Sequence, residues 1–297
     1  MTGRYTGWIA GGLLAVFAAL VGLSMEAHGP AFPEPANMAD GYGRWRLTGL
    51  PLRLLALRPA IGGDEFLYRN LADPDRMLFL ARLPSLVLGL SLGGLVFHWA
   101  ARIGGGAAGI LALTAYVFCP AILDHAGLAT NDLPGTAAVT AGFYALHRLI
   151  ARTTTTGSDL TFNLWGWAMP ATLLFFIAAL PHMRIGARTL LPLVPVLCVL
   201  GGQMVAGAAS GKGAPTLPPD GRVRMLVAGL LAAWMMAGTL RAGLHFHAED
   251  MGQDLKSLGD WYEADQARHG PAELILSYYG AGDPRYYGML KTQALAP

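Results

Sequence analysis

Side chains that could carry chemistry are few in this chain, and they gather in four short stretches. These stretches hold Glu34 with Asp40, Arg44 and Arg46; Asp124, His125 and Asp132; Arg184 and Arg188; and the residues from His245 to Asp254. A carboxylate can act as a general base that deprotonates an acceptor hydroxyl. Arginine can bind a phosphate leaving group through paired hydrogen bonds. The residue types therefore suit group transfer from a phosphate-linked donor.

The four stretches are set in a strongly apolar chain. Of its 297 residues, 54% are hydrophobic and 13% are charged, whereas a soluble domain has roughly a quarter of its residues charged. This composition predicts a membrane protein. The net charge of +2 gives no reason to expect a nucleic-acid partner. Cys119 and Cys198 lie in apolar stretches and match no metal-binding or disulfide pattern, so we expect them to be small core residues.

Long apolar windows predict the fold, because a helix that spans a bilayer needs about 20 mostly apolar residues. Seven windows qualify, at about 8–25, 82–101, 105–122, 133–151, 162–181, 189–208 and 224–243. The first window has a basic start like a signal peptide, but it is long enough to span, and we interpret it as an uncleaved helix. The prediction is an all-α polytopic membrane protein with a transmembrane domain over residues 1–243.

The Lys and Arg residues of the short loops predict the orientation of these helices. With the N-terminus inside, the inner segments hold Arg102, Arg148 and Lys212, whereas the outer loop 120–132 has no Lys or Arg. An odd number of spans then places the tail, 244–297, outside. All four polar stretches fall on the outer face, which predicts a site at the boundary between membrane and water.

Two outer segments are large enough to hold structure of their own. Loop 26–81 contains LPLRLLALRPA, in which Leu and Arg recur at helical spacing. This pattern predicts an amphipathic helix lying in the membrane interface. In the tail, EDMGQDLKSLGDWYEADQARHG predicts a helix, ELILSYY a strand and GAGDPRYYG a turn. Residues 244–297 are therefore expected to form a small α/β segment.

Each candidate residue also has a purely structural interpretation. Asp132 is the natural N-cap of a helix that starts at Leu133. Arg188 serves equally well as an anchor at the membrane interface. His125 is typical of a solvated loop, and Glu34, which stands between two prolines, of a plain loop carboxylate. Composition and spacing leave these alternatives open.

Several stretches, taken together, resemble the GT-C type of glycosyltransferase, which uses lipid-linked sugars. The nearest likeness is to bacterial relatives of the protein O-mannosyltransferases, the glycosyltransferase 39 group. The most specific is the run from Phe66 to Pro134, which contains ARLPSLVLG and PAILDHAGLATND. MRIGARTLLPLVPVL, and EDMGQDLKSLGDWYE followed by LSYYGAGDPRYYG, come later in the chain. The likeness spans about half of the chain, in the family's order. These stretches place Arg82, Gln253 and Asp254 at motif positions.

The resemblance implies a polyprenyl-phosphate-linked sugar as the donor, membrane lipids as surroundings, and inverting transfer at the outer face without a cofactor or an obligatory metal. It also implies the inner membrane of a bacterium, with the N-terminus in the cytoplasm.

The family's first outer loop typically reads D-E-x-x-H-x-x-x-G-Y, and its leading Asp is taken as the catalytic base. PEPANMADGY fits this frame with Pro33 at the leading acid, Glu34 at the second acid and Asn37 at the histidine. A second frame uses MEAH, which puts Met25 at the leading acid and matches Glu26 and His28 to the acid and the histidine. The leading Asp is absent in both frames.

Further departures lie elsewhere in the chain. Gly127, Thr189 and Met251 stand where the family has Arg, His and Trp. The family also has more spans, and the stretch expected between the fourth span and FNLWGW is missing.

Two functions therefore stay open. In the first, the protein is an active glycosyltransferase in which Glu34 or Asp132 is the base and Arg188, with His125, binds the donor phosphate. In the second, it is a catalytically degenerate relative that serves as a structural or accessory subunit of a membrane protein complex.

Overall fold

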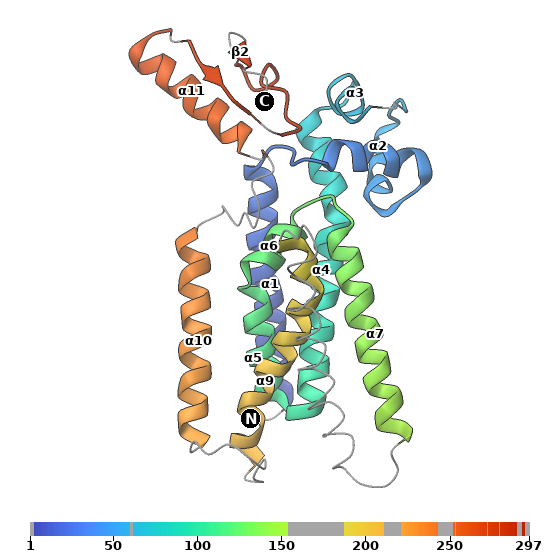
Figure 1. Ribbon diagram of the computed structural model, residues 1–297, viewed down its shortest axis with the longest axis vertical. Coiled ribbons are helices and arrows are strands. Elements are labelled where there is room, and N and C mark those ends of the chain that lie inside the picture. The colour runs from blue at the N-terminus through green and yellow to red at the C-terminus, as the bar shows by residue number, and fades with distance from the viewer. Residues whose placement is uncertain are drawn as a thin grey trace, which may run out of the picture. The chain divides into compact units, whose positions relative to one another are not determined.

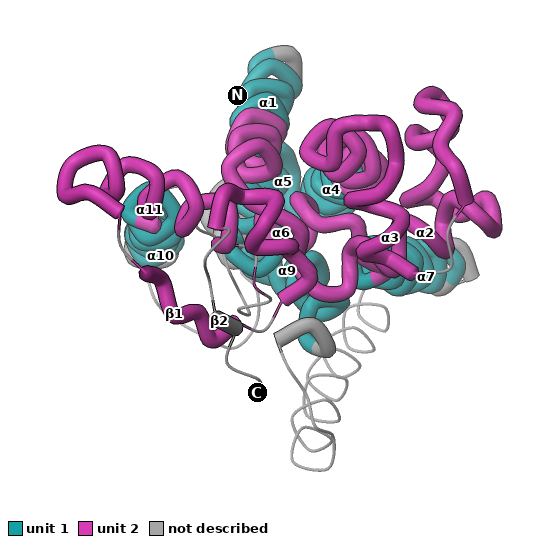
Figure 2. The backbone as a smooth tube through the Cα atoms, turned by 90° about the horizontal axis from the view of Figure 1, so that it is seen from above, with its two compact units in different colours: residues 1–17, 89–122, 132–241 teal, residues 18–88, 123–131, 242–297 magenta. Residues whose placement is uncertain are grey.

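The structure is a computed structural model, and it is mostly helical (Figure 1). It describes residues 3–59, 62–153, 187–210, 221–242, 252, 254–271, 273–278, 280–289 and 293–294. The chain forms two compact units (Figure 2). Unit 1 consists of residues 1–17, 89–122 and 132–241, and unit 2 of residues 18–88, 123–131 and 242–297.

Among the residues that the structure describes, two helices are long and apolar enough to cross a membrane. They are α1 (Gly3–Ala27) and α4 (Pro74–Gly104), and each contributes residues to both units. A third candidate is the pair α5 (Gly106–Val117) and α6 (Pro120–Ala126), which is bent by 65°. Pro120 explains the bend, because proline lacks an N–H group and disfavours helical geometry at the residue before it.

The all-helical prediction is confirmed, but the described residues do not support seven spans. They hold two candidate spans, or three if the bent pair counts as one. The helix α7 (Asp132–Thr153) forms as predicted, whereas the apolar portions near α9 (Val194–Ser210) and α10 (Gly221–Ala242) are shorter than a full span. The predicted span 162–181 lies outside the described residues.

Small residues and a few polar bonds hold the helices of unit 1 together. A Cβ on Gly202 of α9 would collide with the backbone of Ala108 in α5, so the two helices touch at this glycine. Gln203 Nε2 donates a hydrogen bond to Ala100 O at 3.3 Å. On α10, Thr239 Oγ1 donates to Phe118 O at 2.8 Å. The latter bond satisfies a carbonyl at the break between α5 and α6.

Unit 2 contains the segment that joins α1 to α4. This segment forms α2 (Glu34–Arg44), the 3-10 helices η1 (Leu47–Gly49) and η2 (Pro51–Leu55), and α3 (Gly63–Tyr68). Its core is built from buried side chains that include Met38, Leu52, Phe66, Met77 and Ala129. Their burial gives unit 2 an apolar core of its own.

The predicted amphipathic helix at 50–60 is replaced by the short helix η2. Ala56 ends η2 with a left-handed backbone, at φ +48°. Leu52 and Leu57 point into the core, and Tyr42 Oη donates a hydrogen bond to Leu57 O at 2.8 Å. Core packing therefore decides the local conformation here and overrides the helical spacing of the sequence.

The C-terminal segment of unit 2 has the kinds of element that were predicted. The helix α11 (Leu255–His269) lies within the expected helical stretch. The expected strand is reduced to β1 (Ile275–Leu276), which pairs in parallel with β2 (Gln293–Ala294). Leu255, Tyr262 and Met289 form a small buried cluster, and Leu276 of β1 packs against it.

Candidate functional site

The carboxylate of Glu34 is fully buried in unit 2, at the start of α2. Its Oε1 accepts hydrogen bonds from Arg82 Nε at 2.9 Å and from the backbone N–H of Ala129 at 2.7 Å. Its Oε2 accepts from Arg82 Nη2 at 2.6 Å and from the backbone N–H of Ala31 at 2.8 Å. A carboxylate offers about four lone-pair sites, so every site on Glu34 is occupied.

The guanidinium of Arg82, on α4, is equally well satisfied and is only 1% exposed. Besides its two bonds to Glu34, Nη1 donates to Met25 O at 2.9 Å and to His28 O at 3.0 Å, and Nη2 donates to Gly29 O at 2.7 Å. Arginine has five N–H groups, and all five have acceptors. The pair therefore joins α2 and α4 to the C-terminal end of α1 and the turn that follows it.

Three stretches that carry the sequence resemblance converge on this ion pair. Glu34 belongs to PEPANMADGY, Arg82 to ARLPSLVLG and Ala129 to PAILDHAGLATND. Asn37, which stands at the family's histidine in the first frame, donates through Nδ2 to Ala129 O at 3.2 Å. In the second frame, Met25 and His28 supply only backbone oxygens to Arg82.

The geometry gives Glu34 a structural role. A general base needs an accessible lone pair within hydrogen-bond reach of the proton that it removes. Glu34 has no exposed surface, and an acceptor hydroxyl would have to displace Arg82 or a backbone N–H group to reach it. This arrangement does not support Glu34 as the base.

Three other predicted residues belong to unit 2. His125 is completely buried near the end of α6, so it is not a solvated loop residue. Asp254 directly precedes α11, and its Oδ1 lies 3.9 Å from Nε2 of the buried His28. Gln253 lies outside the described residues.

Two predicted residues belong to unit 1. Asp132 is the first residue of α7, one position inside the N-cap place that the sequence predicted, and its carbonyl oxygen accepts a hydrogen bond from Thr136 Oγ1 at 2.9 Å. Arg188 lies in the 3-10 helix η4 (Ala187–Leu193), and its side chain is outside the described part of the structure. The roles of base and phosphate ligand remain predictions for these two residues.

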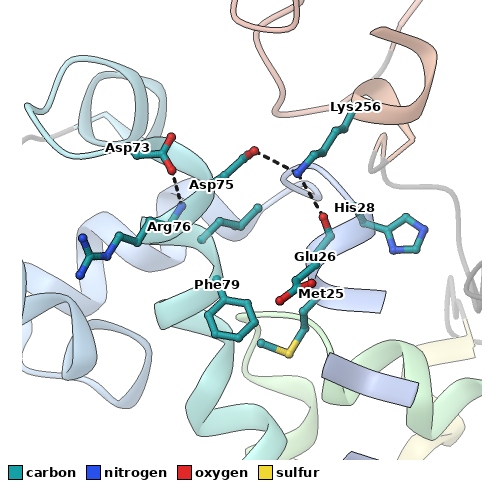
Figure 3. Close-up of a pocket in the computed structure, with 9 residues that line it drawn as sticks. Met25, Glu26, His28, Asp73, Asp75, Arg76, Phe79 and Lys256 are labelled. Atoms are coloured by element: carbon teal, nitrogen blue, oxygen red, sulfur yellow. Dashed lines mark hydrogen bonds and ion pairs between the residues drawn. The ribbon is translucent and has the colours of Figure 1, made fainter. Parts of the chain in front are cut away.

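A pocket of about 260 Å³ in unit 2 was not predicted (Figure 3). It is lined from the end of α1, the start of α4 and the start of α11 by Met25, Glu26, His28, Asp73, Asp75, Arg76, Leu78, Phe79 and Lys256. The lining residues include three carboxylates and two cationic side chains, so their formal charge is −1 with His28 neutral. Carboxylates next to an apolar wall suit a polyol better than a free polyanion.

Lys256 links the walls of this pocket. Its Nζ donates to Asp75 Oδ2 at 2.9 Å and to Glu26 O at 3.1 Å, whereas the Arg76 side chain points away from it (Figure 3). Asp73 Oδ2 accepts from the Arg76 backbone N–H at 3.2 Å, which caps the first turn of α4. Of the polar residues that line the pocket, Glu26 and His28 had been matched to family positions, in the second frame.

Tyrosines fasten the C-terminal segment near the same place. Tyr286 Oη donates to Asp73 Oδ1 at 2.9 Å, and the backbone N–H of Asp283 donates to Tyr68 Oη at 3.0 Å. Burial raises the pKa of Tyr68, Tyr286 and Tyr287 above the ordinary value, and the hydrogen bond to Asp73 raises that of Tyr286 further. These hydroxyls therefore stay neutral near neutral pH and serve as structural hydrogen-bonding groups.

Among the described residues, no group of three or more His, Cys, Asp or Glu side chains is placed to hold a metal ion. Comparison of the chain with protein-family models, curated proteins and solved structures finds no match. The described residues are mostly helical and include two or three helices that could cross a membrane, which is compatible with an integral membrane protein. The likeness to GT-C glycosyltransferases stays a prediction.

Proposed function

We propose that the protein is a degenerate member of the GT-C glycosyltransferase type that acts as a structural or accessory subunit of a membrane protein complex. The single observation that carries this proposal is the saturation of the Glu34 carboxylate by four hydrogen bonds in a fully buried site. Pro33 stands at the position of the leading acid and has no group that accepts a proton. The first outer loop thus lacks a working base under the first frame.

The retained architecture gives the loop a different use. An ion pair whose donors and acceptors are all satisfied holds distant segments in one arrangement, and removal of one partner leaves a buried charge without compensation. The Glu34–Arg82 pair connects three separate stretches in this way. The pair therefore fixes the conformation of the first outer loop even though this loop lacks the leading acid. A loop of fixed conformation is suited to binding a partner protein.

The proposal includes the predicted topology. About seven spans lie in the inner membrane of a bacterium, with the N-terminus in the cytoplasm and the tail outside. The natural partners are other membrane proteins, together with the lipids around the helices.

A transfer assay on the purified full-length protein in lipid nanodiscs tests the proposal. Radiolabelled polyprenyl-phosphate sugars are supplied with peptide and lipid acceptors, and the expected result is no transfer above that of empty nanodiscs. In parallel, crosslinking in native membranes followed by purification is expected to yield a defined partner protein. Transfer that is lost in Asp132→Asn, with folding unchanged, would overturn the proposal.

The second candidate, an active glycosyltransferase, is favoured by the pocket in unit 2. A site for a lipid-phosphate-linked sugar needs an apolar wall, a cation for the phosphate and a carboxylate at the reacting carbon. The pocket offers Phe79 and Leu78, Lys256, and Glu26 in these roles. In unit 1, Asp132 and Arg188 remain the predicted base and phosphate ligand.

The same assay separates the two carboxylates. Loss of transfer in Glu26→Gln points to the pocket, and loss in Asp132→Asn points to the start of α7. Glu65→Gln is the matched control, because Glu65 is an exposed carboxylate of the same unit that lies outside the pocket.

A further inference from the structure

The segment that joins α2 to α3 has an unusual distribution of charge. Between positions 41 and 63 it contains no Asp or Glu, and its arginines are Arg44, Arg46, Arg53 and Arg58. Asp40 pairs with the first two, at 3.0 Å from Arg44 Nε and 3.0 Å from Arg46 Nη1. One carboxylate against four guanidinium groups leaves the segment strongly cationic.

The same segment exposes large apolar side chains within ten residues. Trp45 is 67% exposed, Leu47 40%, Leu50 45% and Leu54 83%. Leu52, between them, is completely buried in the core of unit 2, so the backbone is anchored while its neighbours face outward. Exposed apolar groups beside cations are typical of a surface that binds a partner with both apolar and anionic groups.

Trp45 is held in place by its neighbours. It ends α2 with a left-handed backbone, at φ +58°. The guanidinium of Arg53 lies 3.8 Å from the centre of its ring and 4.6 Å from the ring of Tyr42, and it also donates a hydrogen bond to Tyr42 O. An indole beside a fixed guanidinium combines an apolar body with a cationic group, as in residues of the membrane interface.

The place of the segment in the chain identifies its partner. It lies between α1 and α4, which are both long and apolar enough to cross a membrane. A segment tethered at both ends to such helices lies close to the bilayer surface at any protein concentration. Guanidinium groups bind lipid phosphates, and Trp and Leu enter the boundary between headgroups and acyl chains.

We propose that residues 44–58, termed the anchor segment, dock on the outer surface of the bilayer that holds α1 and α4. Arg44, Arg46 and Arg58 bind anionic headgroups, and Trp45, Leu47 and Leu54 insert at the headgroup level. The inference is independent of any enzymatic activity.

An environment-sensitive fluorophore at position 54 tests the inference. Leu54→Cys is labelled in a full chain in which Cys119 and Cys198 are replaced by Ala, and the protein is reconstituted into phosphatidylcholine vesicles with or without 30% phosphatidylglycerol. Leu71→Cys is the matched control, because Leu71 is 97% exposed and lies outside the anchor segment. The expected result is a blue shift and protection from iodide at position 54 but not at 71, and the effect increases with phosphatidylglycerol.

Removal of the arginine charges is the second part of the experiment. In Arg44→Gln/Arg46→Gln/Arg58→Gln, each lost arginine is expected to lower the ratio of docked to undocked segment about fivefold in anionic vesicles. The control triple Arg69→Gln/Arg268→Gln/Arg285→Gln removes three exposed arginines elsewhere in unit 2 and should leave the ratio unchanged. Equal iodide access at positions 54 and 71 in both lipids would overturn the proposal. So would protection at 54 that occurs only when an acidic protein is added.

Discussion

Glu34 and Arg82 are 48 positions apart in the chain, and they meet in a buried two-pronged ion pair with 2.6 Å between Arg82 Nη2 and Glu34 Oε2. Each partner also bonds to the backbone of segments around it, so the pair works as one unit with residues 25–31 and 129. This relationship changes the role of Glu34 from a candidate base to a structural carboxylate.

Glu34→Gln is expected to lower the free energy of unfolding by about 3–5 kcal/mol, because the neutral amide leaves the buried Arg82 charge without compensation. Denaturant unfolding of the protein in detergent micelles measures the change. Glu65→Gln is the control, since Glu65 is 57% exposed and lies 3.9 Å from Arg69, and exposed pairs of this kind contribute at most about 1 kcal/mol. Equal stabilities of the two variants would contradict the structural role.

Gly49→Ala is expected to destabilise unit 2 by about 1–3 kcal/mol or more, because a Cβ there collides with the backbone of Gly41 and Tyr42 and forces η1 away from α2. Gly43→Ala, in α2, is the control, because a Cβ added at Gly43 has no atom within 4 Å. Because Ala favours a helix over Gly, Gly43→Ala should leave stability unchanged or raise it. Thermal unfolding of both variants measures the difference. A Gly49→Ala variant as stable as the unchanged protein would show that close packing of Gly49 against α2 is not required.

Lys256→Met is expected to loosen the C-terminal segment, since it removes the bonds to Asp75 and Glu26 O. Tyr286→Phe should act in the same direction by removing the bond to Asp73. Each change costs about 0.5–1.5 kcal/mol and is measured as faster amide hydrogen exchange in α11.

Arg268→Met is the control for these two variants, because Arg268 Nε donates to the carbonyl of Ala264 within its own helix. Exchange in α11 that is equally fast in all three variants would argue against fastening by Lys256 and Tyr286.

Alkaline pH is expected to destabilise unit 2. Burial raises the pKa of Tyr68, Tyr286 and Tyr287 in the folded chain, whereas unfolded tyrosine ionises near about 10. Above that pH the unfolded chain releases protons that the folded chain retains, so stability present at neutral pH is lost as the pH rises through about 10 and beyond. Tyrosinate absorbance should therefore show late-ionising tyrosines in the folded protein.

The variant Tyr287→Phe should reduce that late-ionising fraction. Titration of every tyrosine at the same pH in folded and unfolded protein would refute the prediction.

Local patterns in the sequence predicted some elements correctly, for reasons that act within a few residues. Continuous apolar runs predicted α1 and α4, and Asp132 marked the start of α7. The stretch EDMGQDLKSLGDWYEADQARHG, predicted to be helical, contains α11. The number of spans was a weaker prediction. Apolar composition around 105–122 does not show that Pro120 bends the chain by 65° at that place.

What the sequence by itself determined is a helical, apolar, charge-poor chain with its polar groups confined to a few stretches, because composition and periodicity are local properties. The tertiary structure alone decided what those polar groups do. Glu34 became structural because donors from positions 31, 82 and 129 converge on it. Lys256 became a pocket residue because Asp75, 181 positions away, lies within 2.9 Å of it. Burial and such distant pairings depend on how the helices pack, and no short stretch of sequence encodes them.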